Sequence, residues 1–218
     1  MICGVDEAGR GPILGPLVIA GVLFKDDAML KELHVRDSKK ITPKRRISLS
    51  GTIKKIAVNY ELLIIPASDI DTMRKTMTLN DIEVFAFSKI ISKLRPDVCY
   101  VDAADVNEKR FAKEITSNLT FYPKIISKHK ADDIYPVVGA ASILAKAARD
   151  EIVSLIEGEL QKKLPLPMGS GYPADAITIN FLKQWLMKYK TLPPECRHSW
   201  KTAQRLLREN SIKKLDDF

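Results

Sequence analysis

Residues that form disulfides or zinc sites are scarce in this chain of 218 residues. It has three cysteines with no C-x-x-C spacing and no histidine at zinc-finger distance from them. This pattern excludes a disulfide framework and a zinc site, so we expect reduced thiols. No apolar run approaches the roughly 18 residues of a membrane helix, and no secretory signal opens the chain. A cytoplasmic protein with no membrane partner is therefore expected.

Two common glycine motifs of nucleotide-binding proteins are also absent. The stretch CGVDEAGRGPILGP is rich in glycine, but a dinucleotide fingerprint would need glycine where Leu14 stands. The phosphate-binding pattern G-x-x-x-x-G-K-[ST] occurs nowhere in the chain. Gly9 and Gly11 instead favour a sharp backbone turn and allow backbone amides to approach a ligand closely. This loop therefore serves a different purpose.

The charge of the chain is unbalanced toward the basic side. Lysine and arginine number 35 against 27 aspartates and glutamates, which gives a net charge of +8. An excess of this kind favours an anionic partner such as nucleic acid, although solvated surface lysines alone also produce it. Composition leaves both explanations open.

The hydrophobic pattern predicts a mixed α/β fold. Little separates the first two strands, so we expect an antiparallel beginning followed by parallel crossovers. Strands are expected at 1–6, 17–24, 56–66, 97–102 and 121–128. Helices are expected at 43–55, 80–96, 107–118, 138–160, 175–189 and 198–210, and Asp69 is expected to cap a short helical segment. We divide the chain into a core (1–175), a C-terminal helical subdomain (176–210) and a polar tail (211–218).

Carboxylates stand at the ends of two predicted strands. Asp6 and Asp102 each end a short apolar run, and parallel neighbours would bring both to one sheet edge. Glu7 adjoins the first, and Asp132 and Asp133 precede the long predicted helix. Oxygen ligands of this kind suit Mg²⁺ or Mn²⁺, and two such ions catalyse phosphoryl chemistry. The alternative for each acid by itself is that it caps a turn or a helix.

Five motifs in sequence order give the chain a specific resemblance. The motifs are DEAGRGP (6–12), RDSKK (36–40), DAAD (102–105), KHKADDIYPVVGAASILAKAARD (128–150) and GSGYPAD (169–175). With these motifs, the chain resembles archaeal and eukaryotic ribonuclease HII between residues 2 and about 205. The resemblance implies a ribonuclease H-like fold: a five-stranded mixed sheet, three strands antiparallel and then two parallel, flanked by helices, with a helical C-terminal extension.

The same resemblance implies an activity and a set of site residues. Members of the family cleave the RNA strand of RNA/DNA hybrids and nick duplex DNA on the 5′ side of a single ribonucleotide, leaving 3′-hydroxyl and 5′-phosphate ends. The implied cofactors are two Mg²⁺ or Mn²⁺ ions. The positions that match the family's metal-binding acids are Asp6, Glu7, Asp102 and Asp132, which makes Asp133 a bystander. The positions that match its substrate-binding residues are Gly9, Arg10, Gly11, Lys39, Ser142, Lys146 and Tyr172.

Within that set, the resemblance implies distinct roles. The G-R-G loop, residues 9–11, would sense the ribose 2′-hydroxyl, and Tyr172 would stack on the sugar of the next nucleotide. Lys39, Ser142 and Lys146 would lie near substrate phosphates.

The C-terminal sequence IKKLDDF resembles a peptide that binds sliding clamps. Leu215 and Phe218 fit that pattern, whereas Ile212 occupies its glutamine position. We expect a monomer by resemblance. Two alternatives stay open: a nuclease or recombinase of the same fold that acts on DNA alone, and a hybrid-binding module without catalysis.

Overall fold

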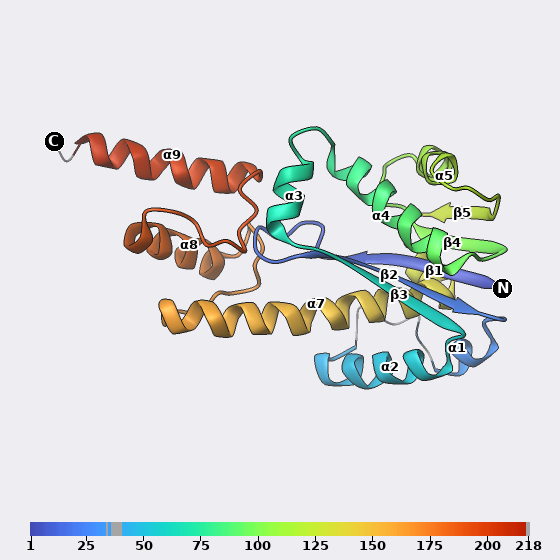
Figure 1. The fold of residues 1–218 in the computed structure, drawn as a ribbon. Coiled ribbons are helices and arrows are strands. Elements are labelled where there is room, and N and C mark those ends of the chain that lie inside the picture. The colour runs from blue at the N-terminus through green and yellow to red at the C-terminus, as the bar shows by residue number, and fades with distance from the viewer. Residues whose placement is uncertain (34, 36–40, 217–218) are drawn as a thin grey trace. The chain divides into compact units, whose positions relative to one another are not determined.

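The computed structural model describes residues 1–33, 35 and 41–216, which belong to two compact units (Figure 1). The first unit consists of residues 1–8, 18–64 and 77–150. The second consists of residues 9–17, 65–76 and those from 151 onward. The division into a core, a helical subdomain and a tail stays a prediction of the sequence. No helix in the described part of the chain is long and apolar enough to cross a membrane.

One five-stranded sheet has the order β3-β2-β1-β4-β5. β2 is antiparallel to β1, β4 is parallel to β1, and β5 is parallel to β4. The Val58 N–H donates to the Leu23 carbonyl over 2.9 Å, so β3 begins beside the end of β2, as antiparallel neighbours do. The predicted mixed sheet is therefore confirmed. Its strands are β1 Ile2–Ala8, β2 Leu17–Phe24, β3 Asn59–Ile65, β4 Val98–Asp102 and β5 Lys124–Lys128.

All the predicted long helices are present, with shifted ends. Two further helices of five and four residues, α1 and α6, were not predicted because they are too short to show a helical period. The helices are α1 Ala28–Glu32, α2 Pro43–Ile56, α3 Ala67–Met73, α4 Leu79–Leu94, α5 Glu108–Ser117, α6 Ala131–Ile134, α7 Pro136–Lys163, α8 Ala176–Tyr189 and α9 Lys201–Asp216. α9 continues past its predicted end at residue 210.

Helix caps explain several of these boundaries. The Thr42 side chain accepts the Arg45 N–H and Pro43 opens α2, as is typical of helix starts. α4 begins with a capping box in which Thr78 and Asp81 each bind the other's backbone N–H. The prediction that Asp69 caps a segment is wrong, because Pro66 takes the cap position of α3 and Asp69 lies in its first turn.

Two glycines allow helices to pack closely against opposite faces of the sheet. A β-carbon at Gly4 would lie 2.2 Å from the Val137 carbonyl oxygen, at the start of α7. A β-carbon at Gly21, which pairs with Val5, would lie 2.3 Å from Ile90 of α4. Because neighbouring strand residues point to opposite faces, α7 covers the face of Gly4 and α4 covers the other (Figure 1). Asp6 therefore points to the α7 face.

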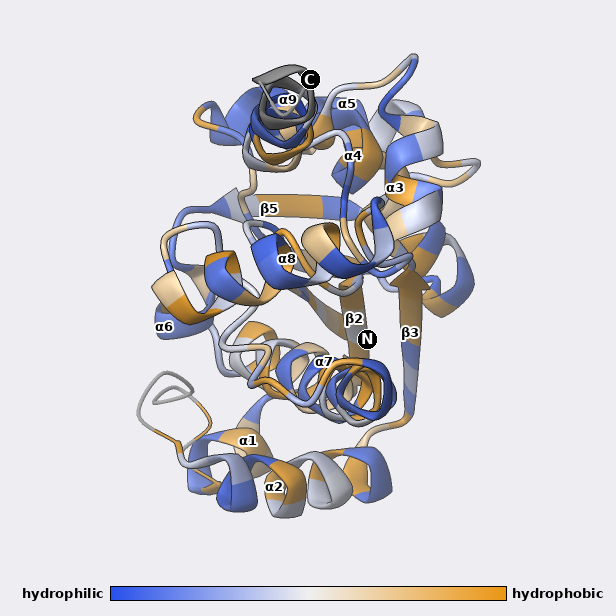
Figure 2. Ribbon diagram, turned by 90° about the vertical axis from the view of Figure 1, so that its left-hand side faces the viewer, coloured by the Kyte–Doolittle hydropathy of each residue, from blue (hydrophilic) through white to orange (hydrophobic). Residues whose placement is uncertain are grey.

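The central strands β1 and β4 place buried cysteines on the face that α4 covers. Cys3 pairs directly with Cys99 across β1 and β4, and both are free thiols with no exposed surface. Both thiols therefore belong to the apolar interior of the first unit. Figure 2 shows β2 and β5 in the hydrophobic colours, as expected for strands covered by helices.

The second unit has an apolar core of its own. Ile13 and Leu14 of the glycine-rich stretch pack with Phe181 and Trp185 of α8 and Leu206 of α9. Leu14 also forms an isolated antiparallel bridge with Cys196. The residues that follow the G-R-G loop are thus anchored among the C-terminal helices.

We expect opposite effects from two glycine-to-alanine substitutions in the first unit. Gly4→Ala should lower the free energy of unfolding by about 3 kcal/mol or more, because its β-carbon would overlap backbone that cannot move aside. Gly51→Ala in α2 has nothing within 4 Å and should raise it by roughly 0.5–1 kcal/mol through helix propensity. Urea unfolding measures both, and a Gly4→Ala protein as stable as the parent would contradict this packing.

Candidate functional site

Two predicted acids meet at the carboxyl ends of neighbouring parallel strands. The register pairs Val5 of β1 with Val101 of β4, so Asp6 and Asp102 follow at adjacent positions. Neighbouring strands lie about 4.8 Å apart, and residues level with each other point to the same face. Asp6 is 4% exposed and Asp102 is half-buried. The convergence predicted for this pair is therefore present.

The surroundings of Asp6 disfavour its negative charge. Burial is the main cause, and the charge of Asp102 adds to it, so the pKa of Asp6 rises to about 8. The charge of Glu7 acts in the same direction. The Ser142 hydroxyl and the Glu7 N–H, which donates to Asp6 Oδ1 over 2.7 Å, offset part of the rise in the pKa. Burial and the neighbouring carboxylates thus disfavour the ionised form of Asp6.

Asp132 reaches this region through the turn between β5 and α6. The Ala131 N–H donates to Asp102 Oδ1 over 2.7 Å, which fixes the start of α6 beside the end of β4. Asp132 is 3% exposed, whereas Asp133 is exposed. The two neighbouring acids therefore differ in burial, and the assignment of Asp132 as a metal ligand stays a prediction.

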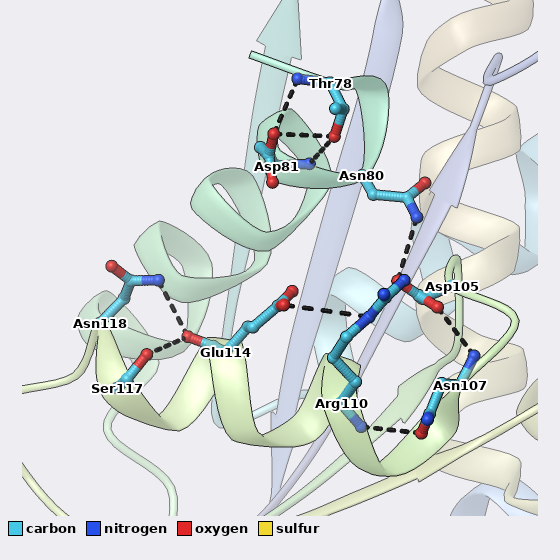
Figure 3. Close-up of polar contacts among 9 residues, drawn as sticks. All are labelled: Thr78, Asn80, Asp81, Asp105, Asn107, Arg110, Glu114, Ser117 and Asn118. Atoms are coloured by element: carbon cyan, nitrogen blue, oxygen red, sulfur yellow. Dashed lines mark hydrogen bonds and ion pairs between the residues drawn. The ribbon is translucent and has the colours of Figure 1, made fainter.

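A buried carboxylate holds the loop that follows Asp102 (Figure 3). Asp105 is 2% exposed and forms an ion pair with Arg110. It also accepts hydrogen bonds from the Asn107 N–H (2.7 Å) and from Asn80 Nδ2 (3.0 Å). These bonds, the Asn107 N–H first, lower the pKa of Asp105. The loop is thereby fixed to both α4 and α5.

Glu108 holds the neighbouring turn in a similar way. Its carboxylate accepts the His129 N–H over 2.7 Å and Lys128 Nζ over 3.2 Å. These contacts connect the beginning of α5 with the end of β5, three residues before Ala131. The sequence did not indicate the roles of Asp105 and Glu108, because their partners come from separate elements.

The predicted set of four acids, Asp6, Glu7, Asp102 and Asp132, suits a divalent cation. Its side chains offer only oxygen atoms, and burial followed by the charge of Asp102 raises the pKa of Asp6, a shift that a bound cation would oppose. Within the described residues, no group of three or more acidic, histidine or cysteine side chains lies close enough to form a preformed metal-binding site. The placement of Asp6 next to Asp102 is observed, and the four-acid ligand set stays a prediction.

The predicted phosphate-binding residues lie partly on α7. Ser142 is fully buried beside Asp6, and Lys146 follows four residues later, on the same face of the helix. Further along α7, Asp150 forms an ion pair with Arg46 of α2. Lys39 lies outside the described residues.

The second unit brings the predicted ribose-recognition residues together. Gly9 has a φ of 90°, a conformation that favours glycine. A β-carbon at Gly11 would lie 3.4 Å from Tyr172 Cε1, so the ring borders the G-R-G loop. The Gly171 carbonyl accepts the N–H groups of Ile13 (2.8 Å) and Leu14 (3.2 Å). Tyr172 itself is 46% exposed, which leaves its ring accessible to a ligand.

Asp175 fixes the loop that carries Tyr172. One carboxylate oxygen accepts the Ser170 N–H (2.6 Å) and the Ser170 hydroxyl (2.7 Å), and the other accepts the Ile177 N–H (2.9 Å) at the start of α8. These bonds, led by the Ser170 N–H, lower the pKa of Asp175 to about 2. The Thr178 hydroxyl donates to the Met168 carbonyl and accepts the Gly171 N–H, both over 2.9 Å.

Comparison with known proteins identifies a family. The family model described as Ribonuclease HII matches residues 3–203. A relative named Ribonuclease HII, from Methanococcoides burtonii, is 45% identical over 94% of this chain and 99% of its own.

Two solved structures are similar in fold. The ribonuclease H2 from Pyrococcus horikoshii OT3 has a TM-score of 0.88 and 36% identity, covering 95% of this chain and 97% of that one. A PCNA:RNase HII complex from Archaeoglobus fulgidus contains a chain with a TM-score of 0.85 and 37% identity, and the match covers 100% of both chains.

We expect Asp175 to make the acid stability of the protein depend on pH. Its pKa is lower in the folded chain, about 2, than the usual 3.8, so its stabilising contribution is complete above about pH 4. The contribution should disappear as the pH falls toward 2. Urea unfolding at several pH values should show a smaller acid loss in Asp175→Asn than in the parent, and parallel pH curves would contradict the role of the carboxylate.

Proposed function

The chain belongs to the ribonuclease HII family and is a ribonuclease H endonuclease, and we propose that it acts on two substrates. It cuts the RNA strand of RNA/DNA hybrids, and it nicks duplex DNA on the 5′ side of a single embedded ribonucleotide. The products carry 3′-hydroxyl and 5′-phosphate ends. The observation that carries this proposal is the pair Asp6 and Asp102, side by side at the carboxyl ends of β1 and β4.

The proposed metal ligands are the four acids Asp6, Glu7, Asp102 and Asp132. When bound, two Mg²⁺ or Mn²⁺ ions would activate a water molecule and stabilise the departing 3′ oxygen. Four carboxylates and two divalent ions are formally neutral, so a scissile phosphate could approach without net repulsion. The bonds made by Asp105 and Glu108 support this role, because they hold the turns on either side of Asp102 and Asp132.

The proposed substrate contacts divide into two groups. Ser142 and Lys146 of α7, together with Lys39, bind backbone phosphates. Gly9, Arg10 and Gly11 recognise the ribose 2′-hydroxyl through backbone groups, and Tyr172 stacks on the following sugar. The proximity of Gly11 to Tyr172 supports a shared function for the second group. A nuclease for DNA alone would have no use for a ribose-reading loop.

A cleavage assay tests the proposed activity. We expect the protein with Mg²⁺ or Mn²⁺ to nick a duplex containing one ribonucleotide and to leave the matched all-DNA duplex intact. Asp102→Asn should lower kcat by about 100-fold or more, because even outer partners of metal ligands contribute 10- to 100-fold. EDTA should abolish cleavage by the parent protein.

The other outcomes of that assay separate the rival functions. Equal cleavage of both duplexes would favour a DNA nuclease. Tight hybrid binding without any cleavage would favour a binding module. Asp133→Asn is the matched control and should retain activity, because Asp133 is exposed and is not among the proposed ligands.

We also propose that the C-terminus binds a sliding clamp. The similarity to the chain in the PCNA:RNase HII complex supports this, as does the fit of Leu215 and Phe218 to a clamp-binding peptide. Leu215 lies in the last turn of α9, and Phe218 lies outside the described residues.

Substitution of the two apolar residues tests clamp binding. The double variant Leu215→Ala and Phe218→Ala should weaken affinity for an archaeal PCNA about tenfold or more, the scale expected for interface anchors. Isothermal titration calorimetry measures the affinity, and Met187→Ala, an exposed apolar residue on α8, serves as the control. Equal affinity of the double variant and the parent would rule the tail out.

A further inference from the structure

Arg197 is a buried charged residue to which the sequence assigned no role. It has no exposed surface and is the largest of the fully buried side chains. Burying a guanidinium costs free energy unless hydrogen bonds compensate the loss of water. An apolar side chain would fill the same space at a lower desolvation cost. The contacts of the guanidinium therefore indicate what the charge does.

The guanidinium binds three carbonyl groups of one loop. Nη2 donates to the Gly9 carbonyl (2.5 Å), Nη1 to the Arg10 carbonyl (2.9 Å) and Nε to the Gly15 carbonyl (3.0 Å). The Arg197 N–H also donates to the Ile13 carbonyl over 2.8 Å. Arginine suits this task because its donors form a rigid planar fork. Two of the three carbonyls belong to the G-R-G loop itself.

Residues 198–200, which follow Arg197, make further contacts that hold the G-R-G loop and the segment that carries Arg197. The Trp200 ring lies 4.8 Å from the Arg197 guanidinium carbon, and its Nε1 donates to the Gly11 carbonyl over 3.3 Å. Asp71 of α3 accepts the N–H groups of His198 (2.7 Å) and Ser199 (2.9 Å), which fixes the segment that carries both side chains. The carbonyls of residues 9, 10 and 11 are thus all bound by Arg197 and Trp200.

The bonds from Arg197 and Trp200 matter because the G-R-G loop belongs to no helix or strand that would fix its backbone. Gly9 and Gly15 have φ values of 90° and 86°, so the backbone on either side can adopt many conformations when nothing holds it. Recognition of a single 2′-hydroxyl by backbone groups requires donors and acceptors placed within a few tenths of an ångström.

We propose that Arg197 is a positioning residue for ribose recognition, which sets the backbone of Gly9, Arg10 and Gly11 through their carbonyls. The inference rests on the proposed function, since it concerns the same loop. Arg197 is buried and acts through the loop. Its loss should therefore reduce the preference for ribose more than the general affinity for duplexes.

A binding experiment without cleavage isolates this effect. In the full chain carrying Asp102→Asn, fluorescence anisotropy gives Kd for a duplex with one ribonucleotide and for the matched all-DNA duplex. We expect the parent background to prefer the ribonucleotide duplex. Arg197→Lys keeps the charge and loses the fork, and should lower the ratio of the two affinities about tenfold, the scale of one lost charge-assisted hydrogen bond. Affinity for the all-DNA duplex should change less than about twofold.

A matched control separates positioning from general destabilisation. Leu206→Ala removes a buried side chain from the apolar core of the same unit and should lower the melting temperature without changing the affinity ratio. An Arg197→Lys protein with an unchanged ratio, or with both affinities reduced equally, would overturn the inference. If the parent background shows no preference for ribose, the proposed function fails first and the inference fails with it.

A second variant keeps the test decisive if Arg197→Lys does not fold. Trp200→Phe retains a ring over the guanidinium and removes only the hydrogen bond to the Gly11 carbonyl. It should shift the affinity ratio in the same direction by about threefold, the scale of one neutral hydrogen bond. An unchanged ratio in a folded Trp200→Phe protein, with no fold obtained for Arg197→Lys, would count against the inference.

Discussion

The repulsion between carboxylates at the end of β1 and β4 is the constraint on which the first unit depends. Asp6 is buried with Asp102 at its side, and water does not screen the pair as it would at the surface. The surrounding bonds oppose a movement apart: Ala131 holds Asp102, and Asp105 and Glu108 hold the adjoining turns. These bonds keep the two carboxylates together at a cost in local stability that the proposed cation would offset.

Charged groups in the second unit have a different purpose. Asp175 bonds to N–H groups of the Tyr172 loop, and Arg197 bonds to carbonyls of the G-R-G loop. Both charges thus hold irregular backbone in one conformation. The first unit passes directly into the second between Ala8 and Gly9, and Gly9 comes two positions after Glu7 in the sequence. The proposed metal ligands Asp6 and Glu7 and the proposed ribose-recognition loop are accordingly close neighbours in the chain.

Local signals in the sequence predicted most of the fold. Strand periodicity depends on neighbouring residues, and the strands predicted at 17–24 and 97–102 agree closely with β2 and β4. The sequence did not predict the role of Arg197, because its partners Gly9, Arg10 and Gly15 come from a distant segment. A buried arginine and an exposed one look alike in a sequence, and only tertiary structure distinguishes them.

The proposed lysine–phosphate contacts and the G-R-G loop held by Arg197 should respond differently to salt. Contacts between lysines and phosphates release counterions and weaken steeply as the salt concentration rises. The bonds of Arg197 to the carbonyls of Gly9 and Arg10 are buried or partly buried, so mobile ions screen them much less. The loop should therefore keep its conformation at salt concentrations that weaken general duplex binding. If the proposed roles hold, raising the salt should lower overall affinity while the preference for ribose persists, because Arg197 holds the backbone geometry of the proposed ribose-reading loop from within the unit.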